Sequence, residues 1–178
     1  MKKTLALLIP VALLSSCAAF TDGYSRLTKE QRNSIVPFNK NLLLSRDYVY
    51  KVNASVLLET LKDYPKAFVY VFTPGCTSDA CFPLTVYENF AKKNGYKVFF
   101  VLSGYGSLDY AFEDPIKEPL FVIDSDYYGK KFLHGYIRPF ENELKGRDKK
   151  DKSGDMEGSL HFYENGVYKD TYVYLPRS

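Results

Sequence analysis

Two cysteines, Cys76 and Cys81, are the residues of this chain whose type and spacing best suit them to chemistry. Residues 67–72 just before them read AFVYVF, an apolar run typical of a buried strand. After them, apolar residues recur at helical spacing until Gly95, a typical helix end. The pattern therefore predicts that Cys76 lies where a strand turns into a helix. Unpaired N–H groups at a helix start favour negative charge, so we predict a reactive thiolate at Cys76.

The spacing of the two cysteines constrains any disulfide between them. Residues five apart on a regular helix are separated by about 500° of turn, so their side chains point roughly 140° apart. Their Cα atoms would also exceed the limit of about 7 Å for a disulfide. A Cys76–Cys81 disulfide would then require the first helical turn to unwind. A redox pair, a static disulfide or two unreactive thiols, and a metal-binding thiol site all remain open from spacing alone.

Residues 73–81 read TPGCTSDAC and resemble the active-site segment of the peroxiredoxin Q (bacterioferritin comigratory protein) group. The strand, cysteine turn and helix also resemble the wider thioredoxin-like superfamily. The resemblance implies that Cys76 attacks peroxide and that Cys81 resolves the resulting sulfenic acid. It implies that Thr73 positions a substrate oxygen or hydrogen-bonds the Cys76 thiolate; the alternative is a turn residue.

The chain departs from the peroxiredoxin pattern at two places and from the wider superfamily pattern at a third. Val69 stands where those proteins carry a proline, and the arginine nearest before the late strand is Arg147. Gly158 and Ser159 stand where the thioredoxin-like superfamily usually has a cis-proline. We therefore expect peroxide to react slowly compared with a full peroxiredoxin, and disulfide exchange stays open as the reaction.

The start of the chain reads as an export signal. Two lysines precede a short apolar stretch, and residues 14–17 read LSSC, which resembles the bacterial lipobox. This pattern predicts a signal peptide at 1–16, an acylated Cys17 that places the bilayer among the partners, and a tether over 17–36. Ala18 favours the outer membrane, facing the periplasm, by the enterobacterial rule. The alternative is an ordinary cleaved signal with an incidental cysteine.

Lipidation of Cys17 would leave Cys76 and Cys81 as the only cysteines able to pair within the chain. Export also permits a disulfide between them.

The remaining residues, 37–178, predict one α/β domain. Strand patterns at 48–52, 67–72, 97–102 and 120–124 alternate with helical patterns, one of them capped by Asn53, and an Asn165-Gly166 turn predicts a final hairpin. We expect a helical stretch within 127–144 to break at Pro139. The predicted fold is thioredoxin-like: a central mixed sheet flanked by helices, with a C-terminal β-hairpin.

The net charge, the histidines and two of the arginines give weaker evidence about function than the cysteines do. The chain carries 24 basic and 21 acidic residues, a net charge of +3, which implies no nucleic-acid partner. Its two histidines, His134 and His161, are expected at the surface or hydrogen-bonded, with a thiolate–histidine metal site as the alternative. Arg138 and Arg147 are surface charges or cations able to approach the thiolate. We expect no cofactor and no metal.

Together these patterns predict a membrane-anchored thiol redox protein that uses Cys76 and Cys81 on a protein disulfide or a peroxide. The alternative is a non-catalytic lipoprotein of the same fold, acting as a binding or structural module with a static disulfide.

Overall fold

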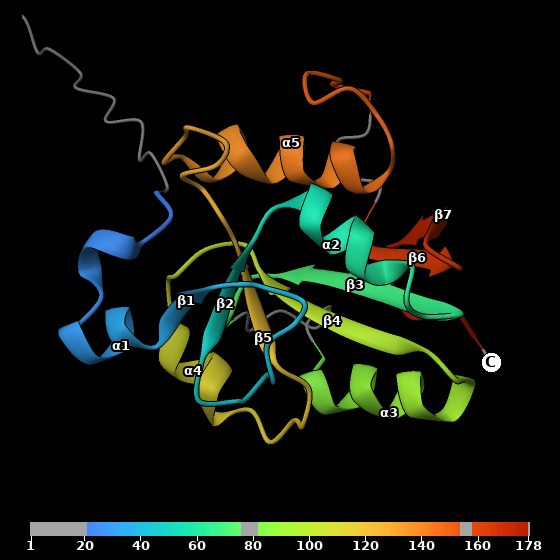
Figure 1. The fold of residues 1–178 in the computed structure, drawn as a ribbon, viewed down its shortest axis with the longest axis horizontal. Helices are drawn as coiled ribbons and strands as arrows, with labels where there is room; N and C mark the ends of the chain where they lie inside the picture. Colours follow the sequence, from blue (N-terminus) through green and yellow to red (C-terminus); the bar gives the residue numbers. More distant parts are fainter. Residues whose placement is uncertain (1–20, 76–81, 154–157, 178) are drawn as a thin grey trace, which may run out of the picture.

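The computed structural model describes residues 21–75, 82–153 and 158–177, and one mixed β-sheet runs through them (Figure 1). The seven strands lie in the order β1-β2-β5-β4-β3-β6-β7. Strands β1 to β5 are parallel, and β6 and β7 are antiparallel to their neighbours. Their bounds are Ile35–Pro37, Val49–Val52, Lys66–Phe72, Lys97–Leu102, Leu120–Ile123, Leu160–Glu164 and Val167–Tyr172.

Helices cover both faces of the sheet. On one face, α3 (Leu84–Asn94) and α4 (Leu108–Glu113) contribute to a core with Phe68 and Phe100. On the other face, α2 (Ala54–Leu61) and α5 (Leu133–Leu144) pack over Val69 and Val101. Figure 1 shows the two helix pairs on opposite sides of the strands.

Strand β3 lies near the middle of the sheet because its sequence suits burial on both faces. Its residues from Ala67 to Val71 are all buried, and successive side chains enter opposite cores. It pairs with β4 on one side and with β6 on the other. The α/β class, the mixed sheet with flanking helices and the C-terminal hairpin are thus confirmed.

Several local signals act as predicted. The Asn53 side chain accepts a hydrogen bond from Val56 N at 3.0 Å and caps α2. Gly95 ends α3 with a left-handed backbone, φ +71°. Asn165 and Gly166 form the turn of the β6–β7 hairpin.

The predicted break at Pro139 is wrong, because α5 continues through it from Leu133 to Leu144. The buried side chains of Tyr136, Phe140 and Leu144 hold the helix against the sheet on both sides of the proline. Tertiary packing therefore outweighs the lost backbone hydrogen bond here.

Residues 21–36, which the sequence suggested were part of a tether, pack against the domain. They form the short helices η1 (Tyr24–Arg26) and α1 (Lys29–Asn33), and then enter the sheet as β1. Leu27 is buried in the same core as Leu108. Across the described ranges, 21–75, 82–153 and 158–177, no helix combines the length and apolarity needed to cross a bilayer.

Candidate functional site

Thr73 directly follows β3, at the edge of the sheet where the parallel strands end. Its hydroxyl lies 2.8 Å from the hydroxyl of Ser103, which follows the neighbouring strand β4. The Ser103 backbone N–H also donates to Phe72 O at 2.8 Å, which holds the two strand ends together. Ligand sites of open α/β sheets form at this carboxyl edge, so the predicted site residue Thr73 lies in a suitable place.

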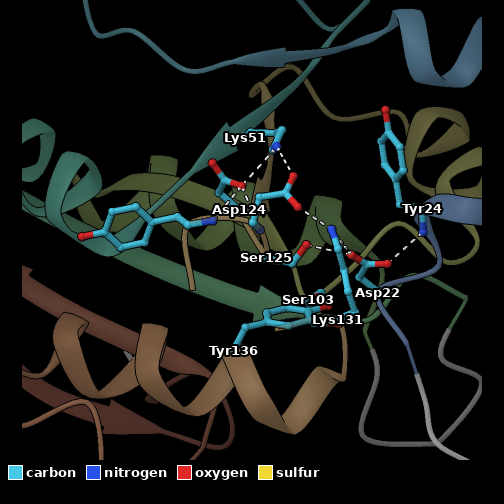
Figure 2. Close-up of polar contacts among 10 residues, drawn as sticks. Asp22, Tyr24, Lys51, Ser103, Asp124, Ser125, Lys131 and Tyr136 are labelled. Carbon is cyan, nitrogen blue, oxygen red and sulfur yellow. Dashed lines mark hydrogen bonds and ion pairs between the residues drawn. The ribbon is translucent and has the colours of Figure 1, made fainter. Parts of the chain in front are cut away.

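Ser103 is a site residue that the sequence analysis did not single out. It is buried, and its carbonyl accepts a hydrogen bond from Tyr136 Oη at 2.7 Å (Figure 2). Its position one residue after a predicted strand was the available signal, because carboxyl ends of adjacent parallel strands meet at one edge. Its hydrogen bond with Thr73 depends on β3 and β4 being neighbours in the sheet, which the hydrophobic pattern of the sequence does not predict.

The loop after Thr73 turns toward α4. Gly75 has φ +72°, a conformation that favours glycine, and a Cβ there would lie 3.5 Å from the ring of Tyr110. The chain therefore enters Cys76 from a left-handed turn packed beside α4.

Cys76, Cys81 and Cys17 lie outside the described residues. The helix after them is described, and its first residue is Leu84, with Pro83 as N-cap. Cys81 thus precedes that N-cap by two residues in the chain, and Cys76 by seven. Helix α3 therefore begins after both cysteines and not at Cys76 as predicted, and its N-terminus lies nearer in sequence to Cys81.

Two clefts meet at Thr73 and Pro74. The first, which we call the aromatic cleft, has a volume of about 500 Å³. Its described lining includes Tyr70, Phe72, Phe82, Pro83, Leu84 and Tyr110. Phe82 and Tyr110 are exposed, so the cleft offers aromatic surface to a ligand.

Polar groups in the aromatic cleft are tuned by burial. Burial raises the pKa of the Tyr70 hydroxyl, and its contact with Tyr87 adds to the effect, so Tyr70 stays neutral. Burial also raises the pKa of the Asp114 carboxyl, while the nearby Arg46 charge works in the opposite direction. Neither group is placed by the structure as a base for Thr73.

The second, which we call the N-terminal cleft, has a volume of about 600 Å³. It is lined on one side by residues 21–23 and 26–28, and on the other by residues 103–107 and the start of α4. Arg26 brings a positive charge to the same cleft as Thr73. Arg26 was not predicted as a site residue, because its segment has the polar composition of a tether.

The arginines and histidines proposed from sequence lie elsewhere. Neither Arg138 nor Arg147 lines either cleft, and Arg147 borders a separate hollow with Gly166 of the hairpin turn. His161 is hydrogen-bonded as expected but is fully buried; its Nδ1 lies 2.8 Å from Thr171 Oγ1, and its Nε2 lies 3.9 Å from Glu141. Within the part of the chain that is described, no group of three His, Cys, Asp or Glu side chains could hold a metal ion.

No protein-family model, curated protein or solved structure matches this chain.

Proposed function

We propose that this chain is a lipid-anchored thiol redox protein with a thioredoxin-like fold, in which Cys76 and Cys81 cycle between dithiol and disulfide. The observation that carries the proposal is the Thr73 hydroxyl at the end of the central strand. It is held by Ser103, lies between two clefts, and precedes Cys76 by three residues.

The strand arrangement supports the thioredoxin-like part of the proposal. The strand before the cysteines has a parallel neighbour on one side and an antiparallel hairpin on the other. A parallel core sheet with an antiparallel C-terminal hairpin is what the thioredoxin-like order of elements predicts. A hydroxyl at the strand end could donate a hydrogen bond to a thiolate, which would stabilise the charged form.

Thiol–disulfide exchange is the reaction we favour. The Cys76 thiolate attacks one sulfur of a substrate disulfide, and the other sulfur leaves as a thiolate. Cys81 then attacks the mixed disulfide, which releases the second substrate thiol and leaves a Cys76–Cys81 disulfide. A dithiol reductant must restore the pair. The aromatic cleft favours this reaction, because its volume and exposed rings suit a substrate much larger than hydrogen peroxide.

Peroxide reduction is the second reaction, supported by the TPGCTSDAC segment. Here the Cys76 thiolate attacks one peroxide oxygen and releases water or an alcohol. Cys81 then displaces the sulfenic hydroxyl as water and forms the same disulfide.

The test compares reduced wild type with Cys76→Ser and Cys81→Ser, using a model protein disulfide and an organic hydroperoxide as separate oxidants. We expect Cys81→Ser to accumulate a mixed disulfide with the protein substrate, and Cys76→Ser to react with neither oxidant. Intact mass follows each product. A wild-type disulfide that resists a dithiol reductant, with no turnover of either oxidant, would instead support a static structural bridge.

A further inference from the structure

Residues 21–23 are fastened to the carboxyl edge of the sheet by buried polar contacts (Figure 2). The Asp22 carboxylate is buried and accepts hydrogen bonds from Ser125 Oγ at 2.7 Å and from Tyr24 N at 3.1 Å. Lys131 Nζ lies 3.7 Å from the same carboxylate. If the segment moved away, the buried Ser125 hydroxyl would lose its acceptor, so these contacts hold residues 21–23 in place.

The Asp22 backbone is held on both sides as well. Its N–H donates to Lys131 O at 2.8 Å, and its carbonyl accepts from Tyr105 N at 2.6 Å. Next to it, Gly23 has φ +82°, and a Cβ there would lie 2.9 Å from Gly106 N. We call residues 21–23 with these partners the Asp22 clamp.

The clamp limits how far the domain can lie from an acylated Cys17. Three residues separate Cys17 from Thr21, so four peptide steps join their Cα atoms, which are at most ~14 Å apart even when the chain is fully extended. The other end of the parallel strands, where β3 begins, is separated from the clamp by the length of β3, roughly 20 Å. The anchor therefore restricts which edge can approach the bilayer.

The surface beside the clamp suits a lipid headgroup region. Phe132, which bridges to Thr21, is 55% exposed, and Tyr24 is 39% exposed. The Arg32 guanidinium lies 5.6 Å from the centre of the Tyr24 ring. Residues 24–33 carry three cations, Arg26, Lys29 and Arg32, and one carboxylate, Glu30. Aromatic rings and cations together are the groups that favour membrane–water interfaces.

We infer that the carboxyl edge of the sheet, through Tyr24, Phe132 and the neighbouring cations, contacts the bilayer surface and turns the Thr73 clefts toward the membrane. The inference rests on the proposed lipidation of Cys17. It adds a second, peripheral membrane contact and a fixed orientation, so the substrates reached would be those at the membrane surface.

The absence of tryptophan from the sequence allows a direct test. The full-length lipidated protein would carry either Phe132→Trp beside the clamp or Val167→Trp after the hairpin turn, positions of similar exposure, 55% and 59%. Asn165 N of that turn donates to Pro65 O, just before β3, which places the control at the other end of the parallel strands. Tyr24→Trp gives a second reporter beside the clamp.

Each variant is reconstituted into vesicles of phosphatidylethanolamine and phosphatidylglycerol, with and without a headgroup nitroxide lipid that quenches nearby fluorophores. We expect quenching several-fold greater at positions 132 and 24 than at 167. Equal quenching at all three positions in protein that floats with the vesicles would overturn the orientation while leaving the lipid anchor intact. Protein that fails to float would overturn the anchor and the orientation together.

Discussion

At the scale of single residues, the account depends on the hydroxyl pair of Thr73 and Ser103. The motif at residues 73–81 pointed to Thr73, whereas no motif pointed to Ser103. Parallel pairing of β3 with β4 brings them to 2.8 Å from each other. A hydroxyl already held by a partner is oriented before a substrate arrives, which is what a donor to a thiolate needs.

Replacing Thr73 with valine keeps the shape of the side chain and removes the hydroxyl. We expect alkylation of Cys76 at pH 7 to slow by about tenfold, since a hydrogen bond to a charged group contributes about 1.5–3 kcal/mol. Thr73→Ser is the matched control and should retain the rate. Equal alkylation rates in Thr73→Val and wild type would show that Thr73 serves only the turn.

Arg26 should contribute through charge and not through contact. Because it is exposed, its attraction for an anion in the N-terminal cleft is screened by salt. We expect Arg26→Gln to lower the Cys76 alkylation rate a few-fold at low ionic strength and to have little effect at high salt. Arg32→Gln, which removes a nearby cation that does not line the cleft, is the control. A loss that is the same at both salt concentrations would contradict an electrostatic role.

At the scale of elements, the strands were largely predictable and their order was not. Residues 97–102 are β-favouring and nearly all apolar, and β4 has those same bounds. The 120–124 segment could be recognised as extended, yet its place between β2 and β4 depends on pairing with residues far away in the chain. Local patterns predict an element, whereas long-range contacts decide its neighbours.

The elements that the sequence missed are short and held by distant side chains. Helix α4 has only six residues, too few to be stable alone. The guanidinium of Arg46 supports its end by donating to the carbonyls of Ala111, Phe112 and Asp114 at 3.0, 3.4 and 3.2 Å. The position of residues 21–27 likewise depends on the Asp22 clamp, and no sequence motif predicts those contacts.

Removing the Arg46 side chain should therefore destabilise the domain through α4. We expect Arg46→Ala to lower the free energy of unfolding by about 1–3 kcal/mol, because the carbonyls at that helix end lose their donor. Urea unfolding followed by circular dichroism measures the change. Lys62→Ala removes an exposed ion pair with Glu59 and should cost less than about 1 kcal/mol. Equal losses in the two variants would refute the capping role of Arg46.

At the scale of the whole molecule, two apolar cores enclose one sheet, and several tyrosines lie within them. Burial raises the pKa of Tyr70, Tyr105, Tyr128, Tyr136 and Tyr163 above the ordinary value near 10. Their hydroxyls therefore stay neutral in the folded protein at pH values where an unfolded chain would ionise them. Ionisation of these tyrosines therefore favours the unfolded state over the folded one.

This effect predicts an alkaline limit to stability. A group whose pKa is raised on folding contributes fully below its unfolded pKa, so the contribution persists up to about pH 10 and falls as the pH rises further. We expect the melting temperature to decline above that pH, with the buried tyrosines ionising together as the protein unfolds. Absorbance of phenolate and circular dichroism can be recorded in parallel. Complete tyrosine ionisation in a still-folded protein would contradict the assigned burial.

The central claim for the whole molecule is that the turn after β3 makes Cys76, and not Cys81, the attacking thiol. The resemblance and the Thr73 hydroxyl favour Cys76, whereas the N-terminus of α3 lies nearer in sequence to Cys81. The most direct measurement is the rate at which iodoacetamide labels each cysteine in the reduced, folded protein at pH 7, read by peptide mass. The account predicts that Cys76 is labelled first and that Thr73→Val removes this advantage. Faster labelling of Cys81 in the wild type would contradict it.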